Sequence, residues 1–312
     1  MKISSIDIGT NTLLMVVAEQ NSTNQSPTVI HDIHAIARLG EGVDQTAYIS
    51  EAAFERASEI VAKYRILCES ERVQHIRAVA TSAVRDAANG AEVCQRLGSI
   101  LGTAIECISG EEEARLSFIG ASDTYKLKTV IDIGGGSTEY VTGENNIISH
   151  RMSVQMGAVR LHERYLRSLP PTPKSIANAR EEVRRQLDLL PQAETMKSGS
   201  FSAGEIIGVG GTFTTLAAID LKLKEFDSAL VHQHILSAER VSDITKYLLT
   251  TPLPLLLENP AIHPKRADIL PAGAVILDET LRFFGASVCT ASTKGLRYGV
   301  LYDTFANLHR RG

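Results

Sequence analysis

The stretch Val130–Glu139 reads VIDIGGGSTE and decides the fold. A short apolar run ends at Asp132, three glycines follow, and another apolar run begins after Glu139, a pattern that predicts a strand, a glycine turn and a second strand. Because glycine has no Cβ, the N–H groups of Gly134, Gly135 and Gly136 can point into one concavity that a phosphate approaches closely. Asp132 would be a hard oxygen ligand beside it, suited to Mg²⁺. The alternative interpretation is a hairpin whose acidic residue only caps the turn.

A second copy of this pattern lies at Ser4–Thr12, SSIDIGTNT. An apolar strand again ends in an aspartate, Asp7, which is followed by Gly9 and by three polar side chains, those of Thr10, Asn11 and Thr12. The two aspartates lie 125 positions apart, so each copy can begin one half of a duplicated α/β architecture. We expect a phosphate chain to be held between the two loops.

The order of predicted elements agrees with such a duplication. The first half reads βββαβαβα: three strands, a helix capped by Ser50, a strand, a helix, a strand and a third helix, with the strands at Ile3–Asp7, Leu13–Glu19, Thr28–Leu39, His75–Ala80 and Ala104–Ile108. The second half restarts with three strands near Val130, Ser137 and Ile147, followed by helices, a strand at Glu205–Thr212 and a mainly helical remainder up to a strand near 287–290. We expect one domain over residues 1–123 with a C-terminal helix at about 300–312, a second over 124–299, and a cleft between them.

Composition excludes several classes of protein. A chain of 312 residues with 44% hydrophobic content can bury a sizeable core, and its net charge of −4 argues against a broad nucleic-acid footprint. The first ten residues do not resemble a signal peptide, and no apolar run approaches the ~18 residues that cross a membrane. The four cysteines show no metal-ligand spacing and are predicted to be buried small hydrophobic residues in a reducing compartment. A cytoplasmic, soluble protein follows.

Two further stretches carry candidate chemistry in the first half. Thr81–Ala87, TSAVRDA, places Arg85 in a predicted loop, where it can clamp phosphate oxygens or simply form a surface turn with Asp86. Ile108–Arg115, ISGEEEAR, begins a helix in which Ser109 and Glu112 have capping-box spacing. Glu113 is then left for another role, although acids in general favour the first turn of a helix.

Three more stretches lie in the second half. Ile206–Thr215, IIGVGGTFTT, is a predicted strand that runs into Gly210, Gly211 and Thr212, and it can hold a phosphate or the adenosine part of a nucleotide. Its glycines do not follow the dinucleotide-binding order. Lys265–Gly273, KRADILPAG, and Ser292–Gly299, STKGLRYG, place basic residues beside small ones, a pattern that is also typical of solvated helix ends.

Taken in order, these motifs resemble those of the exopolyphosphatase and guanosine pentaphosphate phosphohydrolase family, over nearly the whole chain. The resemblance implies the fold class of actin, hexokinase and the heat-shock-70 ATPases (ribonuclease H-like), with a duplicated βββαβαβ core. It also implies Mg²⁺-dependent, or other divalent-cation-dependent, hydrolysis of the terminal phosphate of a phosphoanhydride chain. Longer members append a helical C-terminal domain, whereas this sequence resembles the short, two-domain form.

The resemblance also assigns roles to residues. It makes Glu113 the catalytic base and Arg85 a phosphate ligand, with Glu139 orienting metal or water. Asp132 and Asp7 would serve the metal together with Glu139. The phosphate-binding positions are Gly9, Thr10, Asn11, Thr12, Gly134, Gly135, Gly136, Ser137, Gly210, Gly211 and Thr212. Lys265, Arg266, Lys294 and Arg297 would add basic contacts.

Three classes of function stay open at this point. The leading hypothesis is a hydrolase acting on inorganic polyphosphate, with guanosine pentaphosphate (pppGpp) as the alternative substrate. A sugar or acetate kinase of the same fold class, or a non-catalytic nucleotide-binding protein of the actin type, are the other two. Polyphosphate has no base to recognise and needs only repeated phosphate contacts, which favours it. Nucleic acid and membranes are not expected partners, and a homodimer is possible.

Overall fold

The computed structural model describes residues 1–21, 26–121, 126–145, 147–191, 193 and 202–311. The chain divides into two compact units, one formed by Met1–Gly120 together with Gly295–Gly312, the other by Ala121–Lys294. The domain boundary expected at 123/124 lies outside the described residues. Among the described residues, the helices lack the length and apolarity that crossing a bilayer requires.

The sheet of unit 1 has five strands in the order β3-β2-β1-β4-β5. The first three strands form an antiparallel meander, whereas β4 and β5 run parallel to β1. The strands are β1 (Lys2–Ile8), β2 (Thr12–Glu19), β3 (Thr28–Ile36), β4 (His75–Ala80) and β5 (Ile105–Cys107). The helices are α1 (Val43–Thr46), α2 (Glu51–Ser70), α3 (Ser82–Asp86), α4 (Gly90–Leu101), α5 (Gly110–Ala121) and α14 (Leu296–Arg311).

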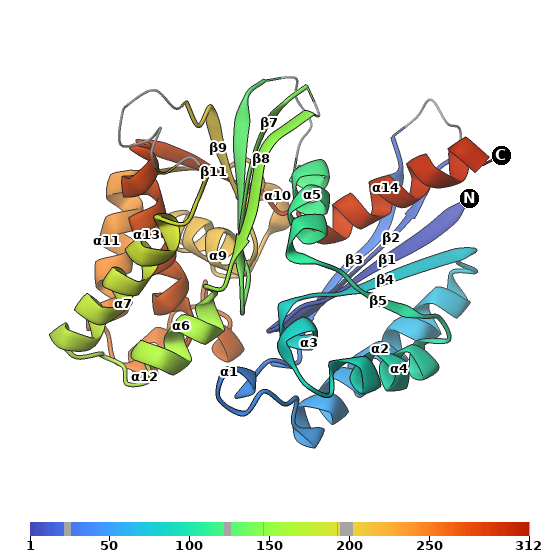
Figure 1. Ribbon diagram of the computed structural model, residues 1–312, viewed down its shortest axis with the longest axis horizontal. Coiled ribbons are helices and arrows are strands. Elements are labelled where there is room, and N and C mark those ends of the chain that lie inside the picture. Colours follow the sequence, from blue (N-terminus) through green and yellow to red (C-terminus); the bar gives the residue numbers. More distant parts are fainter. Residues whose placement is uncertain (22–25, 122–125, 146, 192, 194–201, 312) are drawn as a thin grey trace. The chain divides into compact units, whose positions relative to one another are not determined.

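Helices cover both faces of this sheet (Figure 1). On one face, α2 begins where the Ser50 hydroxyl accepts the Ala53 N–H, and it buries Phe54 and Val61 in a core shared with α4. On the other face, α14 packs Leu301 and Phe305 against Ile3 and Val16. Each of these fully buried side chains contributes about 1.5–3 kcal/mol. The C-terminal helix therefore belongs to the core of unit 1.

The sheet of unit 2 repeats this topology and extends it by one strand. Its order is β10-β11-β9-β6-β7-β8, in which β6, β7 and β8 form the antiparallel meander and β9 and β11 continue in parallel. The strands are β6 (Lys128–Ile133), β7 (Thr138–Glu144), β8 (Ile147–Val154), β9 (Glu205–Val209), β10 (Ile235–Ser237) and β11 (Val288–Ala291). The predicted duplication of an α/β fold is confirmed.

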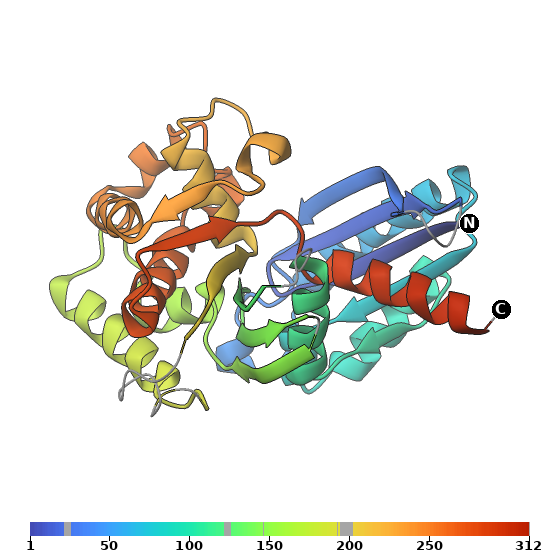
Figure 2. The same cartoon turned by 90° about the horizontal axis from the view of Figure 1, so that it is seen from above.

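Helix α13 is the centre of the core of unit 2. It contacts α6, α7 and α11, and these helices pack beside the sheet (Figures 1 and 2). Tyr140 of β7 is fully buried, and its hydroxyl shares a hydrogen bond of 2.9 Å with the Thr280 hydroxyl of α13. The helices are α6 (Ala158–Tyr165), α7 (Pro173–Leu187), α9 (Gly211–Asp220), α10 (Ser228–Val231), α11 (Ala238–Thr250), α12 (Leu253–Leu257), the 3₁₀ turn η1 (Pro264–Arg266) and α13 (Leu270–Phe284).

The structure corrects four local predictions. The loop expected at TSAVRDA is the short helix α3, because the Thr81 carbonyl accepts the Arg85 N–H at 3.0 Å. The strand predicted to run to Thr212 ends at Val209, since Gly210 has φ 92° and α9 begins after it. Strand β10 lies in a segment predicted as mainly helical. Of the cysteines, Cys68 and Cys289 are buried, whereas Cys94 is half-buried and Cys107 is exposed.

Candidate active site

Sheet topology brings the segments that carry Asp7, Arg85 and Glu113 to one end of the sheet of unit 1. Ile8 of β1 lies beside Ala80 of β4, and Ala80 lies beside Cys107 of β5, so these parallel strands end together. Asp7 precedes the end of the first strand, while α3 and α5 follow the other two. The carboxyl ends of parallel strands are where open α/β sheets bind ligands.

The loop Gly9–Thr12 is shaped by donors from another segment. The Thr10 carbonyl accepts the Gly40 N–H at 2.8 Å, and the Asn11 carbonyl accepts the N–H groups of Ala37 and Arg38 at 3.1 and 2.9 Å. A Cβ at Gly9 would lie 2.8 Å from the Thr12 carbonyl oxygen, so the turn requires glycine. The loop thus has its carbonyls held on one side.

Glu113 and Arg85 form a buried ion pair at this edge. Glu113 is 6% exposed, and Nη1 of Arg85 donates to its Oε2 at 3.1 Å and to the Ile108 carbonyl at 2.9 Å. The Nη2 group of Arg85 is buried and has no acceptor among the described residues. The guanidinium of Arg85 thus anchors Glu113 and retains a buried donor.

Glu112 forms its hydrogen bonds with residues at the start of α5. The Ser109 hydroxyl accepts the Glu112 N–H at 3.2 Å, which confirms half of the expected capping box. The Glu112 carboxylate turns instead to Arg115, with bonds of 2.8 and 2.7 Å. Of the acids at the start of α5, Glu113 is the buried one.

Two carboxylates stand side by side in unit 2. Asp132 of β6 lies directly opposite Glu139 of β7, and Glu139 lies opposite Ser153 of β8, so the three side chains share one face of the sheet. Glu139 is 1% exposed, and its Oε1 accepts a hydrogen bond of 2.7 Å from the Ser153 hydroxyl. The register of unit 1 differs here, because Asp7 lies opposite Leu14.

The donor set near Asp132 fits Mg²⁺. The part of the chain that the structure describes holds no cluster of three or more His, Cys, Asp or Glu side chains that could bind a metal. Mg²⁺ is usually bound through one or two carboxylates, with waters and substrate phosphates completing the shell. Asp132 and Glu139 supply that number of carboxylates.

The glycine loop Gly134–Ser137 is tied by its carbonyls to the start of α6. The Gly134 carbonyl accepts the Ala158 N–H at 2.9 Å, and the Gly135 carbonyl accepts the Val159 N–H at 2.9 Å. Gly157 allows this approach, since a Cβ there would lie 2.4 Å from the Gly135 carbonyl carbon. The loop therefore rests on the helix start.

The same arrangement fixes the direction of three N–H groups. The Gly136 carbonyl accepts Nε of Arg160 at 2.8 Å, so three successive loop carbonyls are held on the α6 side. These peptide bonds are trans, and in a trans peptide the N–H points opposite to the C=O. The N–H groups of Gly135, Gly136 and Ser137 consequently point away from α6, and successive N–H groups of this kind form an anion-binding concavity.

A third glycine segment, Gly210–Thr212, lies beside Asp132. A Cβ at Gly210 would lie 3.1 Å from Oδ1 of Asp132, and a Cβ at Gly211 would collide with Nη1 of Arg266 at 1.4 Å. The Arg266 guanidinium thus lies over the first residue of α9. Burial lowers the pKa of Arg266 to about 10.

Comparison with known proteins identifies the family. The model of the Ppx/GppA phosphatase family matches residues 16–308. The chain belongs to this family. Exopolyphosphatase 2 of Mycobacterium tuberculosis is 33% identical over 293 residues, which cover 90% of each chain. A guanosine-5'-triphosphate,3'-diphosphate pyrophosphatase of Vibrio vulnificus is 27% identical and matches 98% of this chain but 60% of its own length.

Solved structures agree with this assignment. A crystal structure of an exopolyphosphatase-like protein has a TM-score of 0.90 at 31% identity and covers 99% of this chain and 100% of its own. An exopolyphosphatase from Cytophaga hutchinsonii has a TM-score of 0.87 at 25% identity, with 98% of both chains covered. Membership of the Ppx/GppA family confirms the predicted enzyme class, a hydrolase acting on phosphoanhydride bonds.

One predicted phosphate contact has another use in the structure, and two residues near the site were not predicted. Arg297, expected to contact phosphate, donates Nε and Nη2 to Asp32 at 2.8 and 2.9 Å and so fixes the start of α14 to β3. Ser153 and Arg160 escaped prediction altogether. Pairing the strands near 137 and 147 as a hairpin would have placed Ser153 opposite Glu139, but no local signal marks Arg160.

Proposed function

We propose that the protein is a Mg²⁺-dependent exopolyphosphatase that removes the terminal phosphate of inorganic polyphosphate. The observation that carries this proposal is the glycine loop of unit 2. Its three successive N–H groups, at Gly135, Gly136 and Ser137, point away from α6 and contact an anion through the backbone alone. Such a contact needs no base or sugar, which suits a polymer made only of phosphate.

Glu113 is proposed as the base that orients and deprotonates the attacking water. The Arg85 guanidinium holds the Glu113 carboxylate through Nη1. Its buried Nη2 supplies a charged donor for a phosphate oxygen. A positioned carboxylate base contributes ~10²–10⁴ in rate, while fixed donors stabilise the charge that develops on the phosphoryl oxygens.

Asp132 and Glu139 are the proposed Mg²⁺ ligands. A cation held by these carboxylates would supply positive charge near the phosphoryl oxygens. The Ser153 hydroxyl holds one oxygen of Glu139, which limits rotation of that carboxylate. Asp7 is a further proposed metal ligand, at the corresponding strand end of unit 1.

Guanosine pentaphosphate is the second candidate substrate. The likeness to the Vibrio pyrophosphatase over 98% of this chain supports it. Polyphosphate ranks first because the similarity to Exopolyphosphatase 2 is higher, at 33% identity, and covers 90% of both proteins. The kinase and assembly-protein hypotheses lose their support with membership of the phosphatase family.

The deciding experiment compares the two substrates on one preparation. Phosphate release from long-chain polyphosphate and from pppGpp is measured with Mg²⁺ and without any acceptor, and kcat/KM is determined for each. We expect the larger kcat/KM with polyphosphate. A kcat/KM for pppGpp that is larger by about tenfold, or 1.4 kcal/mol in transition-state stabilisation, would reverse the assignment. Glu113→Gln serves as the inactive control.

A further inference from the structure

The charged side chain of Arg160 contacts the backbone of the glycine loop Gly134–Ser137. Its Nε donates to the Gly136 carbonyl at 2.8 Å, and its own N–H donates to the Gly135 carbonyl at 3.1 Å. Arg160 lies in the first turn of α6 and is half-buried. Both its backbone and its side chain therefore hold the loop.

The three carbonyls of the loop are not held in the same way. Those of Gly134 and Gly135 accept N–H groups of the α6 backbone, which any residue except proline would supply. The Gly136 carbonyl lies beyond these donors and accepts the Arg160 side chain instead. The turn is also closed by the Gly134 N–H, which donates to the Ser137 carbonyl at 3.0 Å, so Arg160 adds a side-chain restraint on the peptide between Gly136 and Ser137.

This peptide carries the third donor of the proposed phosphate site. Because its C=O is held toward α6, its N–H at Ser137 points to the opposite side, with the N–H groups of Gly135 and Gly136. Glycine at 136 gives the peptide no side-chain restraint against rotation. Without the arginine, the Gly136 carbonyl would lose this hydrogen bond, and the Ser137 N–H would be held less firmly in the common direction.

We propose that Arg160 is a positioning residue, which fixes the Gly136–Ser137 peptide so that three successive N–H groups face the same phosphate. This inference rests on the proposed function, since the loop is taken as the phosphate-binding element. Arg160 acts through the backbone and is not required to touch substrate. Its role adds a residue that the loop sequence itself does not contain.

The test replaces Arg160 and uses Arg167 as the matched control. Arg167 also donates Nε to a backbone carbonyl, that of Glu163 at 2.6 Å, but it lies outside the glycine loop. We expect Arg160→Gln to lower kcat/KM for polyphosphate by about ten- to a hundredfold, which is less than the ~10²–10³ lost when a preorganised donor itself is removed, because Arg160 only positions the donor. Arg167→Gln should stay within about twofold of wild type, and Arg160→Lys, which keeps a cationic donor, should recover part of the loss.

A binding measurement separates positioning from general damage. Tripolyphosphate is titrated into the protein while the amide resonances of Gly135, Gly136 and Ser137 are followed by NMR. In Arg160→Gln, the Ser137 shift should be lost or strongly reduced while the Gly135 shift persists. If Arg160→Gln does not fold, Arg160→Met, which keeps an unbranched side chain but has no donor, carries the same comparison.

Two results would overturn different statements. If all three amides of Arg160→Gln shift as in wild type, and kcat/KM changes no more than in Arg167→Gln, Arg160 is not a positioning residue. If wild type releases no phosphate from polyphosphate and its loop amides do not respond, the proposed function fails, and this inference fails with it.

Discussion

The two glycine loops have the same backbone plan but different supports. In unit 1, the carbonyls of Thr10 and Asn11 are held by the irregular segment Ala37–Gly40. In unit 2, the carbonyls of Gly134–Gly136 are held by the start of α6 and by Arg160. A loop supported by a helix start and a charged side chain keeps more of its N–H groups in one direction.

The carboxylates beside the loops differ as well. Asp132 has Glu139 directly opposite, whereas Asp7 has Leu14. Unit 1 supplies instead the Glu113–Arg85 pair. The duplicated topology thus supports a division of chemistry, in which unit 1 carries the proposed base and unit 2 the carboxylate pair and the anion-binding loop.

The largest expected effect tests the base of unit 1. Glu113→Gln should lower kcat for polyphosphate by ~10²–10⁴, because an amide cannot accept the proton of the attacking water. The control is Glu112→Gln, whose carboxylate is already bound to Arg115 and which should retain kcat within a few-fold. Phosphate release under saturating substrate measures both. A reversed order would move the proposed base from Glu113 to Glu112.

The next effect compares the two strand-end aspartates. Asp132→Asn should raise the Mg²⁺ concentration for half-maximal activity by about tenfold or more, because a neutral amide binds a hard cation poorly. Asp7→Asn should have a smaller effect, since no second carboxylate lies opposite it. Activity after chelation and Mg²⁺ titration, together with calorimetric Mg²⁺ binding, measures both variants. Equal losses in the two variants would contradict the expected difference between the two aspartates.

A third prediction concerns the supports of the two loops. A Cβ at Gly157 would lie 2.4 Å from the backbone of Gly135, whereas one at Gly40 would meet only side-chain atoms, the Thr10 methyl at 2.3 Å and Cβ of Ala83 at 2.9 Å. Gly157→Ala should therefore cost about 1–3 kcal/mol of unfolding free energy and raise KM, and Gly40→Ala should cost less. Denaturant unfolding measures the loss of stability of each variant, and steady-state kinetics measures its KM. Equal costs would show that both loops are supported equally firmly.

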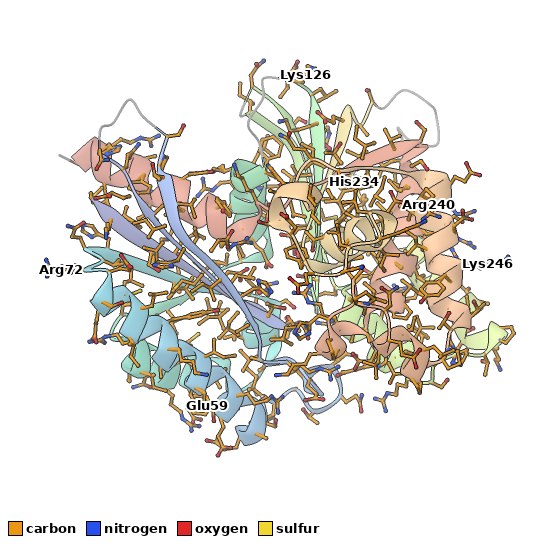
Figure 3. All side chains as sticks on the ribbon, turned by 180° about the vertical axis from the view of Figure 1, so that it is seen from behind. Glu59, Arg72, Lys126, His234, Arg240 and Lys246 are labelled. Carbon is orange, nitrogen blue, oxygen red and sulfur yellow. The ribbon has the colours of Figure 1, made fainter. Side chains whose placement is uncertain are left out.

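The smallest effect concerns acid stability in the two units. Burial alone would raise the pKa of Asp303 in unit 1, but hydrogen bonds from Arg77 and Arg115 outweigh it and hold the pKa below its ordinary 3.8. In unit 2, the effect of burial on the pKa of Asp220 is likewise outweighed by hydrogen bonds from Arg240 and His234, both of which are labelled in Figure 3.

Both aspartates have pKa values that are lower in the folded protein than in the unfolded chain. Their stabilisation is therefore complete above pH values near 4 and is lost as pH falls through the lower, folded-state pKa. Asp303→Asn should cost about 2 kcal/mol at pH 7 and flatten the acid limb of stability. Asp220→Asn should cost less, because only one of its partners is always charged. Denaturant midpoints measured from pH 7 to 3 test whether Asp303→Asn costs more stability than Asp220→Asn. If both variants lose stability with falling pH as wild type does, the prediction is contradicted.

The sequence predicts local structure well where it depends on local chemistry. Asp7 and Asp132 each end an apolar strand and precede glycine, so both strand–loop pairs follow from hydrophobic patterning and from the lack of a glycine Cβ. Ser109 caps α5 as its spacing to Glu112 predicts. The repeated order of strands, and hence the duplicated fold, follows from the same signals. These features depend on residues within a few positions of one another.

Tertiary structure alone decides which distant side chains complete each site. Arg85 and Glu113 are 28 positions apart in sequence, and they meet because β4 and β5 end at the same edge of the sheet. Ser153 holds Glu139 through strand register, and Arg160 holds Gly136 from the start of a helix 24 positions away. Arg297 shows the converse, since a motif typical of ligand binding is used to fix α14 to Asp32. Hydrogen bonds between segments distant in sequence depend on how the elements pack, and no local pattern of residues encodes that packing.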